Sequence, residues 1–389
     1  MSEPLKFVIL GLSITSSWGN GHATTYRALV RALHALGHEV LFLERDTEWY
    51  ASNRDDHAPA GCRVELYTSV AELRRRFRDQ VAAADATIVG SYVPDGVEVL
   101  RWVTDTARGL RLFYDIDTPI TLAQLAEGRE TYLTPQSVRD LDGYLSFTGG
   151  PLLGRLEREF GAKVALPLYC SVDPEAYAPE QQAPKRDLGY LGTYSADRQP
   201  TLDRLLTEPA RAWPEGRFVV AGPCYPELDW PPNVERIEHV APGQHRAFYG
   251  SLRFTLNVTR RDMIESGYSP SVRLFEAAAC AVPIVSDVWS GIEEFFEPGS
   301  EIVLATSSEQ VLELLRGAAE EERRTIGERA RARVLRQHTA LHRAKQLEGY
   351  VLELRAGRLG AARAAASTGL RSRRAEGRAA EVPAKAVDS

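Results

Sequence analysis

The stretch at residues 266–283, SGYSPSVRLFEAAACAVP, carries groups that bind an anion. Its pattern predicts a loop followed by a helix, with Ser269 as the N-cap and Pro270 as the first helical residue. The amides of Ser271 and Val272 would then have no partner within the helix and would point outward. Because a helix start of this kind binds phosphate, the stretch predicts an anion site.

Two charged side chains follow on the same predicted helix. Arg273 and Glu276 are three residues apart and therefore share a face. They place one cation and one carboxylate beside the anion, which suits a diphosphate and a ribose whose hydroxyls need an acceptor. Glu276 can equally be a solvated or salt-bridged helix residue. The apolar run at residues 282–287 predicts a buried parallel strand after this helix.

A pair of arginines precedes this stretch. Arg260 and Arg261 lie in the loop after a strand predicted over residues 254–258. Either side chain, placed beside a diphosphate, would stabilise the charge of a leaving group. Adjacent residues seldom face the same way, so we expect only one of the two to do so.

A glycine loop near the N-terminus suggests a different chemistry. Gly19 and Gly21 stand between a predicted strand and a helix, and Glu44 ends the next strand, which is the context of a dinucleotide-binding fingerprint. The third glycine position of that fingerprint is occupied by Thr24. A nicotinamide-dependent enzyme is therefore an alternative function, although the sequence lacks one glycine of the fingerprint.

Two carboxylates stand at the end of a strand predicted over residues 110–116. Asp115 and Asp117 stand where a parallel strand leaves its sheet, which is the edge where ligands bind. They match the short DxD metal-binding pattern, which the rest of the chain does not support. We favour Asp117 as a residue that lines a cleft, as an acceptor ligand or a base. Otherwise the two aspartates cap the following helix.

A repeated order of strands and helices must position these side chains. A strand at 7–14, a helix at 22–36 and a strand at 38–44 form one βαβ unit, which predicts an α/β fold with a parallel sheet. Further strands are predicted at 64–67, 86–92, 110–116, 144–147, 187–194, 218–223, 254–258 and 282–287.

The length of 389 residues suggests two domains. We expect a first domain at 1–170, a linker at 171–186, a second domain at 187–337, a long helix at 338–356 and a disordered basic tail at 357–389.

Composition excludes several classes of function. The hydrophobic share of 44% and the charged share of 26% are ordinary for a globular protein, and the net charge of −6 argues against a nucleic-acid partner. The four cysteines lack the spacing of a zinc site or a disulfide framework. Neither a secretory leader nor an apolar run of about 18 residues is evident. We expect a cytoplasmic protein with no membrane span and no bound metal.

Two longer runs carry a resemblance to a known family. SPSVRLFEAAACAVPIVSD and WSGIEEFFEPGSEIVLA are similar to the donor-binding segment of GT-B glycosyltransferases, and closely to the CgeB-like group, named after a spore-maturation protein. The resemblance covers residues 7–357 and places the chain near the retaining group 1 enzymes of family 4. It implies two Rossmann-like domains that face a cleft, the first binding an acceptor and the second a nucleotide sugar. It also implies a last helix that crosses back to the first domain.

The resemblance assigns roles to single residues. Glu276 matches the second glutamate of an E-x7-E pair, which binds the donor ribose. Tyr268 occupies the position of the first glutamate, which usually contacts the donor sugar. The loop with Gly19 and Gly21 matches one in which glycines approach the transferred sugar or the diphosphate. His22 matches a histidine that is the general base in some inverting members.

A second glycine turn also matches the family. Gly192 and Thr193 correspond to a turn that faces the donor phosphates, and Arg198 corresponds to a basic residue that binds them. The proline-containing run at 165–179 resembles the connector between the two domains. These matches add three residues to the predicted donor site.

The function implied by the resemblance is metal-independent glycosyl transfer of the hexosyltransferase type. The donor would be a nucleoside-diphosphate sugar, with no further cofactor and an acceptor that the sequence does not identify. The sequence does not decide whether the anomeric configuration of the sugar is retained or is inverted with His22 or Asp117 as the base. One alternative is a nucleotide-sugar epimerase or NAD-type enzyme on a similar fold. Another is a non-catalytic spore-coat or assembly protein with a vestigial donor site, which Tyr268 would explain.

Overall fold

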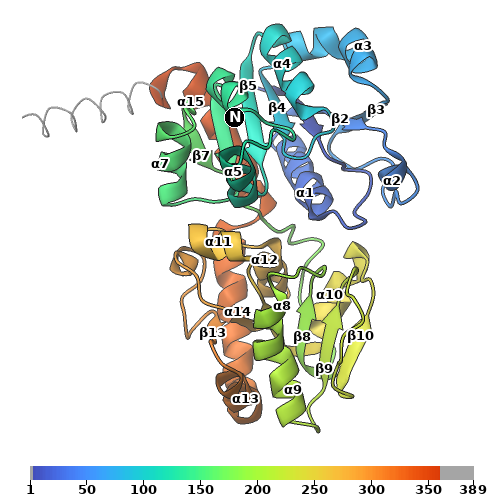
Figure 1. Ribbon diagram of the computed structural model, residues 1–389, viewed down its shortest axis with the longest axis vertical. Helices are drawn as coiled ribbons and strands as arrows, with labels where there is room; N and C mark the ends of the chain where they lie inside the picture. The colour runs from blue at the N-terminus through green and yellow to red at the C-terminus, as the bar shows by residue number, and fades with distance from the viewer. Residues whose placement is uncertain (1–2, 360–389) are drawn as a thin grey trace, which may run out of the picture.

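The two halves of the chain fold as separate α/β units, one above the other in Figure 1. The computed structural model describes residues 3–359. Within that range the strands form two sheets, and the strands of each are parallel. Helices cover both faces of each sheet, as parallel sheets require.

The first unit contains β1 to β7 and α1 to α7. Its strands are β1 (Lys6–Gly11), β2 (Glu39–Arg45), β3 (Arg63–Tyr67), β4 (Ala86–Gly90), β5 (Leu110–Asp115), β6 (Gly143–Ser146) and β7 (Ala165–Pro167). Its helices are α1 (Gly21–Ala35), α2 (Glu48–Ala51), α3 (Val70–Ala83), α4 (Gly96–Thr106), α5 (Thr118–Ala126), α6 (Pro135–Asp140) and α7 (Pro151–Arg158). The strand order is β3-β2-β1-β4-β5-β6-β7.

The second unit contains the remaining strands and most of the remaining helices. Its strands are β8 (Arg186–Leu191), β9 (Phe218–Ala221), β10 (Val234–Ile237), β11 (Leu252–Asn257), β12 (Ile284–Ser286) and β13 (Val303–Leu304), in the order β10-β9-β8-β11-β12-β13. Its helical segments are α8 (Gln199–Leu202), η1 (Asp203–Thr207), α9 (Glu208–Ala212), α10 (Pro242–Gly250), α11 (Arg261–Ser266), α12 (Val272–Ala279), η2 (Ile292–Glu294), α13 (Ser308–Gly317) and α14 (Glu320–Gln337).

The last helix, α15 (Ala340–Arg355), returns to the first unit and packs against α1 and β5. It is the red helix in the upper half of Figure 1. Arg343 on this helix donates to the carbonyl of Tyr169 at 3.1 Å. The predicted crossing of the last helix back to the first domain is therefore present.

Alternation along β1 explains how one sheet buries both faces. Phe7 and Ile9 pack on the side of α1, while Val8 and Leu10 pack on the side of α3. The side-chain period of two in a strand sends neighbours to opposite faces. The near-continuous apolar sequence of this strand follows from that double burial.

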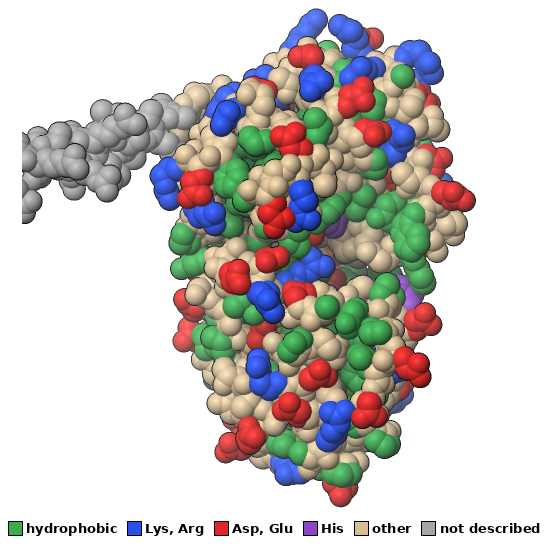
Figure 2. All heavy atoms as spheres, viewed as in Figure 1, with side chains coloured by type: hydrophobic (Ala, Val, Ile, Leu, Met, Phe, Trp, Pro, Cys, Tyr) green, Lys and Arg blue, Asp and Glu red, His purple; other side chains and the backbone are tan. Residues whose placement is uncertain are grey.

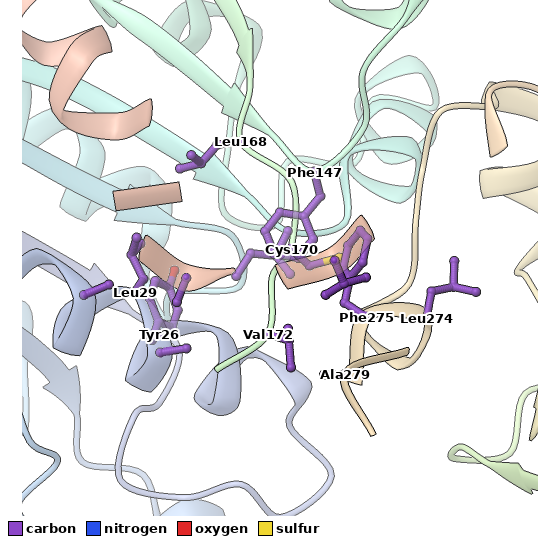
Figure 3. Packing of buried hydrophobic residues seen from close by; sticks show 14 of the residues in the cluster. Tyr26, Leu29, Phe147, Leu168, Cys170, Val172, Leu274, Phe275 and Ala279 are labelled. Carbon is purple, nitrogen blue, oxygen red and sulfur yellow. The ribbon is translucent and has the colours of Figure 1, made fainter. Parts of the chain in front are cut away.

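An apolar core runs through the connector between the two units (Figure 3). Tyr26 and Leu29 of α1, Cys170 and Val172 of the connector and Phe275 of α12 are all buried in one cluster. The connector is therefore packed along this part of its length. The sheet of the first unit ends at Pro167 and that of the second begins at Arg186.

The structure differs from the sequence-based expectations in several places. The short strands β7 and β13 were not predicted, and the proline-rich sequence of β7 resembles a connector. The helix α12 begins at Val272 with Ser271 as N-cap, two residues later than predicted. The reason is that the Ser269 hydroxyl is hydrogen-bonded to Thr148 of the first domain at 2.8 Å and does not cap the helix.

Two further expectations concern the termini and the membrane. Most of the tail predicted at 357–389 lies outside the described residues. None of the helices between residues 3 and 359 has the length and apolarity that a bilayer span requires.

Candidate active site between the two domains

A cavity of about 550 Å³ lies between the two units, where the strands of both sheets end. Figure 2 shows the surface hollowed at this level, with cationic and histidine side chains at the opening. Most of the residues predicted from sequence line it: Gly19, Gly21, His22, Asp117, Gly192, Thr193, Arg198, Arg260, Ser271, Val272, Arg273 and Glu276. Residues about 250 positions apart in the chain thus share one cavity.

Three arginines from different elements approach the same part of the cavity. Arg198 precedes α8, Arg260 precedes α11 and Arg273 lies on α12. Burial lowers the pKa of Arg198, and the positive charges of Arg273 and Arg260 lower it further. Arg198 donates to the carbonyl of Thr193 at 2.6 Å, but its Nε is buried and has no hydrogen-bond partner among residues 3–359. A buried cationic donor without a partner is costly, so this part of the cavity favours an anion.

Close packing fixes the direction of Arg273. Its Nε donates to the carbonyl of Leu191, its Nη1 donates to Asn257 Oδ1 at 3.1 Å, and its guanidinium lies 4.8 Å from the ring of Tyr190. A β-carbon on Gly192 would stand 2.6 Å from Arg273 Nη2. Glycine is therefore required at position 192 for the guanidinium to lie beside the turn.

The carboxylate of Glu276 is buried at the other end of the same helix face. Its Oε1 accepts a hydrogen bond from the Tyr177 hydroxyl at 2.8 Å, and its Oε2 accepts one from the Tyr249 hydroxyl at 3.3 Å. Burial raises the pKa of Glu276, but His245 and Tyr177 lower it, so that the net pKa lies below its usual range. Glu276 is thus an ionised carboxylate with fixed orientation, and not a solvated helix residue.

On the side of the first domain, an aromatic residue separates the two candidate bases. The Tyr92 hydroxyl donates to Asp117 Oδ2 at 3.2 Å, and the rings of Tyr92 and His22 lie 5.5 Å apart. Tyr92 has φ 63°, a strained conformation for a bulky residue that is common at functional sites. Asp117 occupies the N-cap position of α5, but its side chain makes no capping hydrogen bond. The expectation that Asp117 lines the cavity agrees with this geometry.

His22 is held neutral by its surroundings. Burial lowers its pKa, and the nearby Asp117 opposes that shift only in part. The amide of His22 donates to Asn20 Oδ1 at 3.0 Å, so Asn20 caps α1 and the histidine side chain does not. His22 Nδ1 is buried and has no hydrogen-bond partner among the described residues. A neutral imidazole of this kind can accept a proton.

Asp115 does not share a metal site with Asp117. It is fully buried and accepts hydrogen bonds from the Tyr144 hydroxyl, from Thr121 Oγ1 at 2.9 Å and from the amide of Asp117 at 3.2 Å. Burial raises the pKa of Asp115 to about 6. The two carboxylates of the DxD pattern therefore face different environments, which removes the geometric basis of that interpretation.

The glycine loop also departs from a dinucleotide site. Glu44, which would bind the ribose of a nicotinamide cofactor, is fully buried and accepts four hydrogen bonds at 2.6–3.0 Å from Ser13, Ile14 and Thr15. A carboxylate has about four lone-pair directions, so these bonds occupy all of them. Glu44 therefore holds the backbone of this loop, and its carboxylate has no lone pair left for a ligand.

Three of the predicted donor-site residues lie outside the cavity lining. Arg261 is exposed, and of the arginine pair only Arg260 lines the cavity. Tyr268 and Ser269 instead connect the domains, because the Gly149 amide donates to the Tyr268 carbonyl at 2.9 Å. This arrangement gives no support for a contact between the sugar donor and the side chain of Tyr268 or Ser269.

Several residues that shape the site were missed by sequence reasoning: Tyr92, Tyr177, His245, Tyr249 and Asn257. Two of them had a usable signal. Tyr177 is an aromatic residue in the run at 165–179 that resembles the connector, and Asn257 is a polar residue that ends a buried strand. His245 and Tyr249 lie on an ordinary amphipathic helix, so nothing in their spacing distinguished them.

Known proteins are similar to this chain in part of its sequence and in its fold. Residues 198–349 match a family model described as glycosyl transferase-like. No curated protein matches the chain in sequence. Three solved structures, each covered over 100% of its own chain and 90% of this one, are similar at low identity. A sucrose-phosphate synthase from Thermosynechococcus elongatus has a TM-score of 0.65 at 15% identity. HepE from Anabaena, in complex with UDP and glucose, has a TM-score of 0.64 at 12% identity. An alpha-glucosyltransferase in complex with UDP has a TM-score of 0.65 at 12% identity.

These likenesses show the fold. The chain has the GT-B architecture of two Rossmann-like domains, as predicted from its sequence. More particularly, its second half is glycosyltransferase-like in sequence as well.

Proposed function

We propose that this protein is a glycosyltransferase that moves a sugar from a nucleoside-diphosphate sugar to an acceptor bound against the first domain. The observation that carries the proposal is the convergence of Arg198, Arg260 and Arg273 on one part of the cavity, with Arg198 Nε lacking a partner. A diphosphate supplies the anionic oxygens that these donors need. Glu276, on the same helix face as Arg273, supports a ribose beside that diphosphate.

The three arginines supply positive charge where the leaving group forms. As the bond between the sugar and the diphosphate breaks, negative charge grows on the departing oxygen, and fixed cations lower the cost of that charge. The start of α12, at Ser271 and Val272, also lines the cavity, and the free amides of a helix start favour an anion. We infer that transfer needs no metal ion, because these groups perform the task that a metal would otherwise perform.

The finer assignment rests on the resemblance over residues 269–305. It favours a CgeB-like, retaining enzyme of the hexosyltransferase type, in which the acceptor attacks the same face of the sugar that the diphosphate leaves. The similar structures solved with UDP favour a uridine nucleotide as donor. His22 and Asp117 support the opposite stereochemistry, because a neutral histidine and a carboxylate on the acceptor side can each serve as base. Analysis of the anomeric linkage in the product distinguishes the two.

The competing classes have less support. The occupied lone pairs of Glu44 weigh against a nicotinamide cofactor at the glycine loop. An epimerase would act on the sugar nucleotide without an acceptor. A non-catalytic assembly protein is favoured by one observation, that Tyr268 does not line the cavity although its counterpart usually contacts the donor sugar.

Thermal unfolding with a panel of ligands tests the proposal. The panel contains nucleoside diphosphates, UDP-glucose and other sugar nucleotides, and NAD(P), each with the wild type, Glu276→Gln and Glu276→Ala. A ligand at a hundred times its Kd adds about 2.7 kcal/mol, which raises the melting temperature by several degrees. We expect one nucleoside diphosphate family to stabilise the wild type and to lose most of that effect in both variants.

Glu265→Ala is the matched control, because Glu265 is exposed and lies outside the cavity lining. It should bind as the wild type does. Stabilisation by NAD(P) alone would favour the oxidoreductase. Binding of a sugar nucleotide without hydrolysis or transfer would favour the assembly protein, and the absence of any shift would contradict the proposed donor site.

A further inference from the structure

The carboxylate of Glu276 is shared between parts of the chain that are far apart in sequence. Tyr177 belongs to the connector between the domains, 99 residues before Glu276, and donates to Oε1. Tyr249 belongs to α10 and donates to Oε2. Since each carboxylate oxygen can accept two hydrogen bonds, one direction on each oxygen stays available. Two neighbouring ribose hydroxyls need two such acceptors.

His245 completes the arrangement from the other side. Its Nε2 lies 3.1 Å from the carbonyl of Val240, and because a carbonyl can only accept, Nε2 must carry a hydrogen. Its Nδ1 lies 3.1 Å from the Tyr177 hydroxyl oxygen and 3.7 Å from Glu276 Oε2. His245 therefore lies beside both the carboxylate of Glu276 and the backbone that follows β10.

Hydrogen counting favours the protonated form of His245. In the neutral form Nδ1 can only accept, and the single hydrogen of the Tyr177 hydroxyl cannot serve both Nδ1 and Glu276 Oε1. In the imidazolium form Nδ1 donates to the Tyr177 oxygen, and the Tyr177 hydrogen is free for Glu276. Every donor in the cluster then has an acceptor.

The charges around His245 agree with that count. Burial lowers its pKa, but the Glu276 carboxylate and the Val240 carbonyl raise it, and the net shift is upward. The titratable and charged groups that face it are Glu276 and Arg273 on α12, Tyr249 on α10, Tyr177 on the connector and His239 after β10. Of these, only Glu276 is an anion at neutral pH, so its charge, with the Val240 carbonyl, favours the proton on the histidine.

We propose that Tyr177 and His245 are positioning residues for the nucleotide: they hold Glu276 so that its free acceptor directions face the ribose hydroxyls, and they make nucleotide affinity depend on a proton at His245. This inference rests on the proposed function. Loss of that proton removes the donor to Tyr177, lets the Tyr177 hydrogen turn toward Nδ1, and leaves Glu276 held by Tyr249 alone. The ribose would then meet a less ordered carboxylate and bind more weakly.

Calorimetric binding of UDP, GDP and ADP, each beside its 2′-deoxy analogue, tests the inference. With the base that the wild type binds, we expect Tyr177→Phe to weaken the ribonucleotide about tenfold, as for a lost hydrogen bond to a charged group. The 2′-deoxynucleotide should weaken by less than threefold, because one of its contacts to Glu276 is already absent. Tyr194→Phe, in the same domain but outside the cavity lining, is the control and should change neither.

A pH series separates positioning from a merely structural role. Between pH 7 and 9 the charge of the diphosphate is nearly constant, since its last pKa is about 6. Wild-type affinity for the ribonucleotide should fall across this range, and that of His245→Asn should not. Tyr249→Phe removes the other hydrogen-bond donor to Glu276. It replaces Tyr177→Phe as the test variant if Tyr177→Phe lowers the melting temperature too far for binding to be measured.

The outcomes are distinct. Equal losses for ribo- and deoxynucleotide in Tyr177→Phe, or a wild-type affinity that is flat with pH, would overturn the positioning role while leaving the donor site intact. Failure of the wild type to bind any of the three diphosphates would overturn the proposed function and this inference together.

Discussion

A β-carbon on Gly150 would lie 2.3 Å from the ring of Tyr268, so the tyrosine rests directly on the glycine. On its other side the same ring faces Gly291, where a β-carbon would lie 2.4 Å away. Gly150 belongs to the first domain and Gly291 to the second. Tyr268 is thus held between the domains, which explains why the residue in place of the first glutamate does not line the cavity.

Gly150→Ala should destabilise the protein. The methyl group meets the Tyr268 ring, and overpacking of this kind costs about 1–3 kcal/mol. The backbone of Gly150, at φ 58° and ψ −145°, lies in a region that essentially only glycine adopts, which adds a further cost of about 1–3 kcal/mol for a residue with a side chain. Chemical denaturation should show the loss as a lower midpoint.

Gly128→Ala is the control for the cost of a positive φ without a side-chain contact. Gly128 has φ +73° and open space around its α-carbon, so alanine there meets no ring. The double variant Gly150→Ala with Tyr268→Ala should lose less than the sum of the two single changes. Equal losses for Gly150→Ala and Gly128→Ala would mean that the ring contact has no energetic weight.

The two adjacent arginines should behave differently. Arg260→Ala removes a cation that lines the cavity and is expected to weaken nucleoside-diphosphate binding about tenfold or more, the usual effect of losing a hydrogen bond to a charged group. Arg261→Ala removes an equal charge one residue away, on an exposed side chain. Titration calorimetry at two salt concentrations separates direct contact from the general field, which salt screens. Similar weakening in both variants would contradict a specific role for Arg260.

Removal of metal ions should leave glycosyl transfer unchanged. In the proposed reaction, the charge of the leaving diphosphate would be stabilised by Arg198, Arg260 and Arg273, which line the cavity and which chelators do not affect. Rates of donor hydrolysis or transfer measured with EDTA, and again with added magnesium or manganese, should agree within a factor of two. A loss of rate in EDTA that magnesium restores would show that the arginines are insufficient.

The fold could be predicted because residues close together in the sequence specify each strand and helix. Strands such as 86–92 and helices such as 22–36 are specified by short-range periodicity, and both are found within two residues at their starts. The placement of Arg198 and Arg273 in one site was predicted from the family resemblance, and both line the cavity.

The contacts that orient the site are not local. Tyr177 and Glu276 are 99 residues apart, and their hydrogen bond depends on how the connector packs against α12. The direction of Tyr268 depends on glycines at positions 150 and 291 and on its own φ of 50°. No periodicity in one sequence encodes such pairs, so the sequence alone did not indicate that Tyr268 would lie between the domains and outside the cavity lining.

Acid should destabilise the protein through a buried histidine at the junction of the domains. His338 stacks on Phe275 with ring centroids 4.8 Å apart, and its Nδ1 accepts from Arg343 Nη2 at 2.8 Å. Burial, and then the neighbouring cations Arg343 and Arg333, lower the pKa of His338 to about 3. The unfolded chain, with an ordinary pKa of about 6.5, therefore binds the proton more readily than the folded chain does.

The sign of the effect follows from that difference. The contribution of His338 is fully present above about pH 6.5 and is lost as the pH falls toward 3, so the free energy of unfolding should fall by about 3 kcal/mol between pH 7 and pH 4.5 from this group alone. His338→Gln keeps an acceptor for Arg343 but cannot titrate. It should be less stable than the wild type at pH 7, because the stacking is lost, and should show a shallower decline with acid. His57→Gln, an exposed histidine, should keep the wild-type slope. Parallel declines in the wild type and His338→Gln would place the acid sensitivity elsewhere in the chain.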